Sequence, residues 1–213
     1  MTEREVLACQ RQPLDHVTIY VGYDMTAPSS AQAGKDIAPA ESPASVPHVF
    51  KQFRALPPPS LEDQTPDFER LMHALDTDIA ATPGVIATLP EVMRKNEFNV
   101  TAVIFQNRLV AVEGGDTSGE AYGIAFDIGT TTVAGYLADL RNGALLDSVA
   151  VTNRQARIGA DVMTRLAHTL EDRDGLAQLQ GDVVASLNGM ISVLLARNGI
   201  DPSRLYLFTA AGN

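Results

Sequence analysis

One short run brings a carboxylate, three hydroxyls and a tight turn together: Asp127-Ile128-Gly129-Thr130-Thr131-Thr132. An apolar, strand-like segment (122–127) leads into it and a second one (132–140) leaves it. Successive backbone N–H groups in a tight turn form a concave nest that suits phosphate. A carboxylate beside it can hold hydrated Mg²⁺, a usual partner of phosphates. The run therefore predicts half of a nucleotide-phosphate clamp, although small residues would also suit a purely structural hairpin.

The composition limits the classes of function. The 213 residues carry a net charge of −10, and 45% of them are hydrophobic. Binding to nucleic acids or anionic membranes needs a basic surface, which an acidic chain lacks. Neither is therefore expected as a partner. No uninterrupted apolar stretch approaches the ~20 residues of a membrane span. With one cysteine and no apolar signal core near the start, the expected location is the cytoplasm.

Four stretches differ in composition. Residues 24–47 are rich in Ala, Pro, Ser and Gly and are expected to form a linker after a short leading segment, 1–23. Residues 48–118 are predicted to form a small α+β unit with a helix from Pro66 through Ile79, a shorter helix at 89–95 and a hairpin made by 100–105 and 109–112. Residues 119–213 are predicted to form strands at 122–127, 132–140, 144–152 and 205–209 and helices at 160–171 and 175–198.

Several of these segments resemble known proteins. The run 127–132 resembles the first phosphate motif of the actin, sugar-kinase and Hsp70 superfamily. The segments 56–63, 67–71 and 153–165, and the terminal 211–213, together resemble reductive activators of corrinoid proteins. The resemblance implies an α/β fold: a small α+β middle domain (48–118), then the N-terminal part of an actin/sugar-kinase/Hsp70-like, ribonuclease H-like ATPase domain (119–213) that is truncated in this chain.

The same resemblance implies a function. Such activators use ATP with Mg²⁺ to drive an electron from a [2Fe–2S] cluster onto Co(II) of a corrinoid protein or corrinoid-dependent methyltransferase, giving Co(I). The segment Val6–Gln10 resembles the end of the cluster domain, so residues 1–23 are expected to be a remnant of that ferredoxin-type domain. This makes Cys9 a cluster ligand in an intact parent. Four thiolates hold such a cluster, so none is expected in this chain alone. We expect a fragment that is inactive by itself, and we allow for a homodimer.

Each candidate residue has an assigned role and an alternative. Asp127 is expected to be catalytic and to hold Mg²⁺ through water, while Gly129, Thr130, Thr131 and Thr132 bind the phosphates. A polar cluster near the cleft is expected from three further residues at the start of a helix, namely Asn153, Gln155 and Asp161. Equally, Asp161 could merely complement the helix dipole, and Asn153 and Gln155 could support the loop. Rival functions are a sugar or small-acid kinase and an actin-like interaction module that binds nucleotide without turnover.

Overall fold

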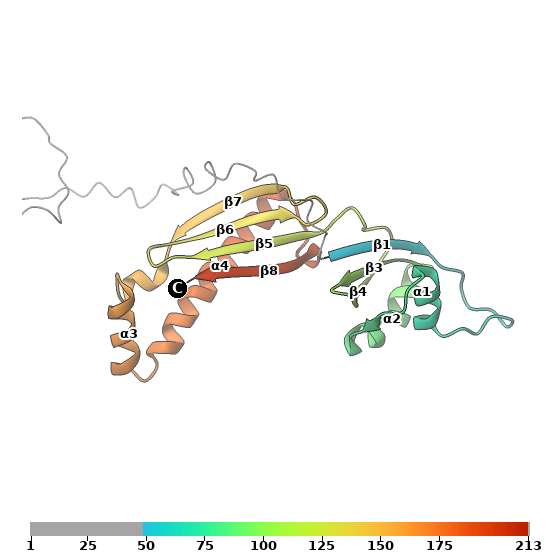
Figure 1. Cartoon of the computed structure of the whole chain (residues 1–213), viewed down its shortest axis with the longest axis horizontal. Helices are drawn as coiled ribbons and strands as arrows, with labels where there is room; N and C mark the ends of the chain where they lie inside the picture. Colours follow the sequence, from blue (N-terminus) through green and yellow to red (C-terminus); the bar gives the residue numbers. More distant parts are fainter. Residues whose placement is uncertain (1–48, 213) are drawn as a thin grey trace, which may run out of the picture.

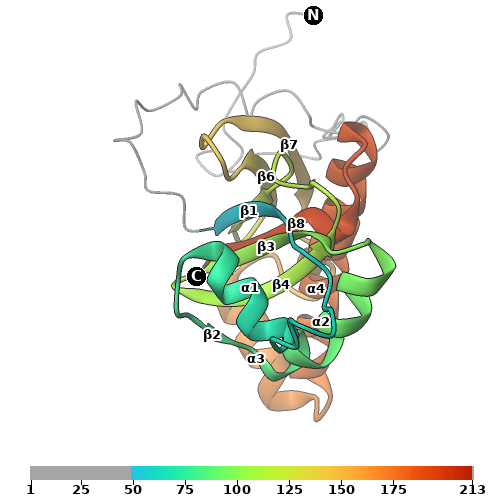
Figure 2. The ribbon, with the colours of Figure 1, turned by 90° about the vertical axis from the view of Figure 1, so that its right-hand side faces the viewer.

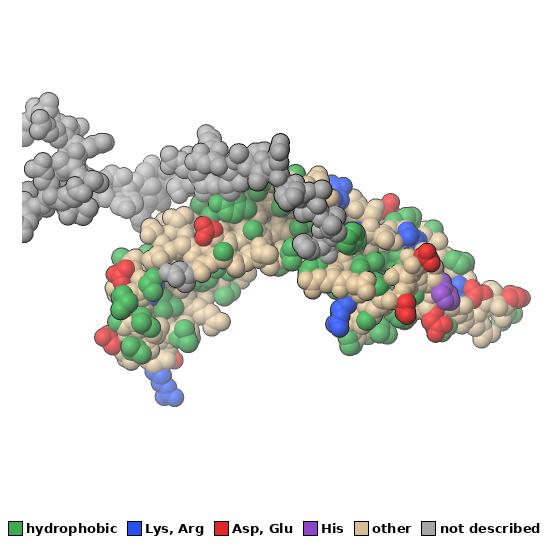
Figure 3. All heavy atoms as spheres, viewed as in Figure 1, with side chains coloured by type: hydrophobic (Ala, Val, Ile, Leu, Met, Phe, Trp, Pro, Cys, Tyr) green, Lys and Arg blue, Asp and Glu red, His purple; other side chains and the backbone are tan. Residues whose placement is uncertain are grey.

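The computed structural model describes residues 49–212, which form two units joined end to end. Each unit is a four-stranded mixed sheet with its own helices, and together they make an arch whose underside is hollowed (Figures 1 and 3). The predicted α/β fold class is confirmed. Residues 1–48, including Cys9, and Asn213 lie outside the described residues.

The first unit contains strands β1 (Val49–Ala55), β2 (Ala80–Ala81), β3 (Asn99–Phe105) and β4 (Arg108–Gly114). The sheet order is β1-β3-β4-β2, with β2 parallel to β4 and the other pairs antiparallel. Helices α1 (Asp67–Leu75) and α2 (Pro83–Lys95) cover one face of this sheet (Figure 2). Their apolar sides form a core with β3 and β4 around Leu71, Leu89, Met93, Val100 and Leu109.

The two helix boundaries predicted for this unit were wrong. Helix α1 ends at Leu75 because Asp76 adopts a left-handed conformation, with φ of 51°. Ile79 is buried in the core as a loop residue beyond that end. Helix α2 begins at Pro83, where a proline at the first turn loses no hydrogen bond. It continues through Pro90, a residue that normally predicts a helix end, and so it is longer than expected. The predicted β3–β4 hairpin is present, with positive φ angles at Gln106 and Asn107 in its turn.

The second unit contains strands β5 (Tyr122–Ile128), β6 (Thr132–Asp139), β7 (Leu145–Thr152) and β8 (Leu205–Gly212). Between β7 and β8 lie the 3₁₀ turn η2 (Arg154–Arg157), helices α3 (Val162–Glu171) and α4 (Gly175–Asn198), and the 3₁₀ turn η3 (Pro202–Arg204). The sheet order is β7-β6-β5-β8, in which β8 runs parallel to β5. All four predicted strands and both predicted helices are present.

Helix α4 provides the core of the second unit. Met190 and Leu194 pack on Ile124, Phe126, Val133 and Leu137 of the sheet. Within residues 49–212, α4 is also the one helix long and apolar enough to cross a membrane by length and composition. Of its apolar window, 28% is buried inside the protein.

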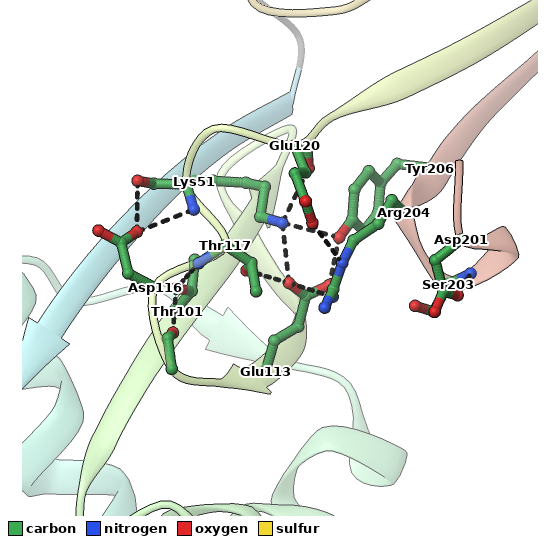
Figure 4. A network of polar contacts seen from close by, with 12 residues as sticks. Lys51, Thr101, Glu113, Asp116, Thr117, Glu120, Asp201, Ser203, Arg204 and Tyr206 are labelled. Carbon is green, nitrogen blue, oxygen red and sulfur yellow. Dashed lines mark hydrogen bonds and ion pairs between the residues drawn. The ribbon is translucent and has the colours of Figure 1, made fainter. Parts of the chain in front are cut away.

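A partly buried polar network, which we call the junction, ties the two units together (Figure 4). Glu113 of β4 accepts a hydrogen bond from Lys51 Nζ of β1 at 2.8 Å and faces Arg204 Nη1 of η3 at 2.7 Å. Tyr206 of β8 and Thr117 also donate hydroxyl hydrogen bonds to Glu113. A cluster of charges therefore contributes to the contact between the two sheets.

Candidate functional site

The candidate site lies at the edge of the second sheet where β5 and β8 end together. Because the two strands are parallel, their carboxyl ends meet at the same edge: Asp127 pairs with Ala211, and Ile128 with Gly212. The Asp127 side chain is exposed, and none of residues 49–212 donates a hydrogen bond to it. This carboxylate is therefore free to face water, a cation or a ligand at the open end of the sheet.

The β5–β6 hairpin is closed by its own backbone. Gly129 N donates to Thr132 O at 2.9 Å, so this amide is not available to a phosphate. A Cβ at Gly129 would lie 2.7 Å from the same Thr132 oxygen, closer than a real Cβ approaches backbone. The glycine is thus required by a close backbone approach inside the hairpin, and its φ angle is not positive.

Asn153 holds the hairpin from behind. It is 1% exposed; its Nδ2 donates to Gly129 O and its backbone N to Thr131 O, both at 2.8 Å. Its Oδ1 accepts from Gln155 N at 2.9 Å, which fixes the side-chain orientation. A buried amide with its donors and acceptor satisfied in this way is a structural clamp. The structure therefore places Asn153 beneath the hairpin, supporting the loop.

Arg165, a residue with no role assigned from the sequence, takes the remaining hairpin carbonyl. This side chain of α3 is 8% exposed, and its Nη2 donates to Thr130 O at 2.6 Å. Its Nε donates to Gly159 O at 2.9 Å and its Nη1 to Gln155 Oε1 at 3.0 Å. The guanidinium therefore links α3, η2 and the hairpin. The arginine stands in the segment that carries the resemblance, but its spacing there gives no sign of this contact.

These contacts decide which way the hairpin amides face. In a trans peptide the C=O and the following N–H point in opposite directions, and residues 49–212 contain no cis peptide. The carbonyls of Gly129 and Thr130 are drawn toward Asn153 and Arg165. The N–H groups of Thr130 and Thr131 therefore point to the opposite side, beside the exposed Thr131 side chain. Successive outward N–H groups are one condition for an anion-binding nest.

Gln155 and Asp161 take supporting positions. Gln155 Nε2 donates to Leu179 O of α4 at 3.0 Å, so this side chain connects the site to the core helix. Asp161 is the N-cap of α3 and accepts from both Thr164 N and Thr164 Oγ1 at 2.9 Å. These hydrogen bonds lower the pKa of Asp161 below its usual value. Both of its oxygens are thus engaged by the helix that carries Arg165.

The groups at this edge suit a hydrated Mg²⁺ bound together with a polyphosphate better than a metal ion held by protein side chains alone. Residues 49–212 contain no group of three or more His, Cys, Asp or Glu side chains placed to hold a metal ion. Mg²⁺ is commonly bound by one or two carboxylates, several waters and substrate phosphates. Asp127 is an exposed carboxylate at the end of β5, in the strand that leads into the hairpin. The proposed cluster ligand Cys9 lies outside the described residues.

Comparisons with known proteins agree with this architecture. Residues 41–119 match the family model for the RACo linker region, and residues 122–213 match that for the RACo middle region. The chain belongs to the RACo family. The α+β unit that we predicted as a middle domain falls in the family's linker region, and the unit carrying the site falls in its middle region.

Two longer relatives add detail. The corrinoid activation enzyme RamQ of Eubacterium limosum is 25% identical, over 99% of this chain and 35% of RamQ. A solved structure of a reductive activator for corrinoid, iron-sulfur protein superposes with a TM-score of 0.70 and 29% identity, over 82% of this chain and 29% of that chain. This chain thus spans about a third of the length of these relatives.

Proposed function

We propose that this chain is the nucleotide-phosphate half of an ATP-dependent reductive activator of corrinoid proteins. Its partner would be a Co(II) corrinoid protein or corrinoid-dependent methyltransferase in the cytoplasm, and the electron would come from a [2Fe–2S] cluster that Cys9 helps to hold in a longer protein. The family membership and the two relatives support the activator function. One observation supports the nucleotide role: buried Asn153 and Arg165 turn the amides of Thr130 and Thr131 outward, next to the unengaged Asp127.

Each group at this edge has a distinct task in the proposal. The two amides, with the hydroxyls of Thr130, Thr131 and Thr132, bind phosphate oxygens. The Asp127 carboxylate orients a water of bound Mg²⁺, and the metal offsets phosphate charge. ATP can drive an unfavourable electron transfer only if it binds two conformations of the activator with different affinity. Because one lobe supplies few contacts, we expect this chain alone to bind Mg·ATP weakly, in the millimolar range typical of about −4 kcal/mol.

Backbone NMR of the ¹⁵N-labelled 213-residue chain tests the phosphate site directly. Titration with Mg·ATP should shift the Thr130 and Thr131 amide resonances saturably, and adenosine should not. The turn at Asn142 and Gly143, between β6 and β7, is the internal control because the proposal gives it no ligand. Asp127→Asn should weaken the response when Mg²⁺ is present and strengthen it without the metal, because the substitution removes a negative charge near the phosphates. If Mg·ATP leaves both hairpin amides unmoved at 10 times the expected dissociation constant, roughly 10 mM, the nucleotide proposal is wrong.

The activator part has its own test. Binding of this chain to a purified Co(II) corrinoid protein can be followed by calorimetry, with the corrinoid-free form of the same protein as control. Complex formation that depends on the corrinoid would support the proposal. Equal binding, or none, of both forms would contradict a direct partner role for this part of the activator.

A further inference from the structure

Arg165 differs from the other buried charged residues in having no opposite charge as a partner. Within residues 49–212, three charged residues are buried as whole residues, namely Arg70, Asp139 and Arg165; Lys51, whose side chain alone is 2% exposed, pairs with Glu113. Arg70 pairs with Asp63 at 2.5 Å, and Asp139 pairs with Arg141 at 2.6 Å. Arg165 forms no ion pair with any described residue, and its three acceptors are all neutral oxygens.

A buried charge without a counter-charge is unfavourable unless something else compensates for it. The neighbouring acid is Asp161, but both of its oxygens bind Thr164 instead of the guanidinium. Each nitrogen of Arg165 donates to a neutral oxygen, so no carboxylate is bonded to the guanidinium, and Asp161 acts on its charge only from a distance. That charge sits directly behind the peptide whose N–H faces the open edge of the sheet.

Through its hydrogen bond to Thr130 O, the charge of Arg165 can influence the N–H groups at this edge of the sheet. Thr130 O and the Thr131 N–H belong to one peptide group and point in opposite directions. A cation bonded to the carbonyl polarises the peptide and makes its N–H a stronger donor, because hydrogen bonds in series strengthen one another. The Thr131 amide is therefore the hairpin donor that Arg165 affects most.

We propose that Arg165 is a positioning residue for polyphosphate: its charge acts through the Thr130–Thr131 peptide, and the anion bound on the far side supplies the missing counter-charge. This inference rests on the proposed nucleotide function and adds a residue that does not touch the ligand. It predicts that the charge at position 165 matters more than the shape of the guanidinium. If Arg165 only supported the loop, the shape of its guanidinium would matter more for ligand binding than its charge.

Two substitutions separate charge from shape. Arg165→Gln removes the charge and keeps a side chain that can donate to Thr130 O. Arg165→Lys keeps the charge, but one ammonium cannot reproduce the guanidinium fork over three acceptors. The matched control is Arg70→Gln, which removes an equally buried arginine from the first unit, away from the hairpin.

The experiment titrates each ¹⁵N-labelled variant with Mg·ATP and with inorganic tripolyphosphate. We expect Arg165→Gln to weaken both ligands about tenfold, the size expected for a unit charge one peptide away at an effective dielectric constant of about 20. Arg165→Lys should stay within about threefold of the parent by the same reasoning, and Arg70→Gln should not change either affinity. The free-state proton shift of the Thr131 amide should move upfield in the Gln variant and remain near the parent value in the Lys variant.

The outcomes distinguish this inference from the proposed function. If the parent binds neither ligand, the nucleotide function fails and the inference fails with it. If the parent binds and Arg165→Gln binds equally well, only the inference is overturned. If Arg165→Lys loses as much affinity for the two ligands as Arg165→Gln, the inference is also overturned, because the shape of the side chain would then matter instead of its charge. Should the Gln variant not fold, the Lys variant decides: retained affinity supports the role of charge, and lost affinity refutes it.

Discussion

Replacing Glu113 with Gln tests whether the junction holds the two units together. The substitution keeps the size of the side chain but removes the anion that faces Lys51 and Arg204 at 2.8 and 2.7 Å. The Lys51 side chain is 2% exposed, so its charge would be left buried with neutral acceptors. Removing one partner of a buried ion pair lowers the free energy of unfolding by about 3–5 kcal/mol. Arg204 keeps Glu120 as a partner at 2.9 Å, and we therefore expect the lower end, about 3 kcal/mol.

Urea denaturation and calorimetry measure this loss. For a chain of this size, about 3 kcal/mol corresponds to a fall in Tm of about 6–12 °C. The control is Glu91→Gln, which removes an ion pair whose two side chains are 70% and 74% exposed and should cost at most about 0.5 kcal/mol. Adding Lys51→Met to Glu113→Gln should recover part of the stability, because it removes the orphaned charge. A loss no larger than that of Glu91→Gln would refute the reasoning.

Three further predictions concern other parts of the chain. Gly129→Ala should distort the hairpin, because the new Cβ would meet Thr132 O at 2.7 Å; it should abolish the Mg·ATP-induced amide shifts while leaving the first unit's NMR spectrum intact. Burial alone would raise the pKa of Glu113, but its hydrogen bonds lower it below the usual 4.5. The unfolded state therefore binds the proton first on acidification, so the free energy of unfolding should fall as pH drops below about 5, with a shallower fall in Glu113→Gln. Leu170 and Met163 of α3 are 81% and 71% exposed; Leu170→Glu should reduce concentration-dependent self-association in analytical ultracentrifugation, because large exposed apolar side chains favour association.

Local sequence patterns predicted the strands well and the helix boundaries less well. Alternation of apolar residues and the small residues between them located β5, β6 and β7 almost to the residue. Such patterns depend on neighbours in sequence, so they fail where a distant contact overrides a local preference. Pro90 predicts a helix end, yet α2 continues through it because Leu89 and Met93 on either side are buried in the core. Helix propensity is a weak tendency that tertiary packing overrides.

The junction could not be predicted in this way. Its hydrogen bonds connect residues 62, 93 and 155 positions apart in the sequence, each on a different element. A lysine and a glutamate on strands are, by their types, expected on the surface. The pairing of β3 with both β1 and β4, and of β8 with β5, brings them into one partly buried cluster. The charge composition therefore shows that the chain is acidic, but it does not indicate which charged residues connect the two units.

The candidate site shows the same limit at closer range. The run from Asp127 to Thr132 identifies which donors are available, but a hairpin of that sequence could present its carbonyls to solvent as readily as its amides. The direction is set by Asn153 and Arg165, which arrive from 24 and 35 residues further along the chain and bind the carbonyls from behind. A motif of this kind is thus a necessary local condition for an anion site. The side chains that bind its carbonyls from behind decide whether amides or carbonyls face the ligand. By this reasoning, hairpins of the same sequence that lack the buried amide and guanidinium should not be assigned a nucleotide site from the motif alone.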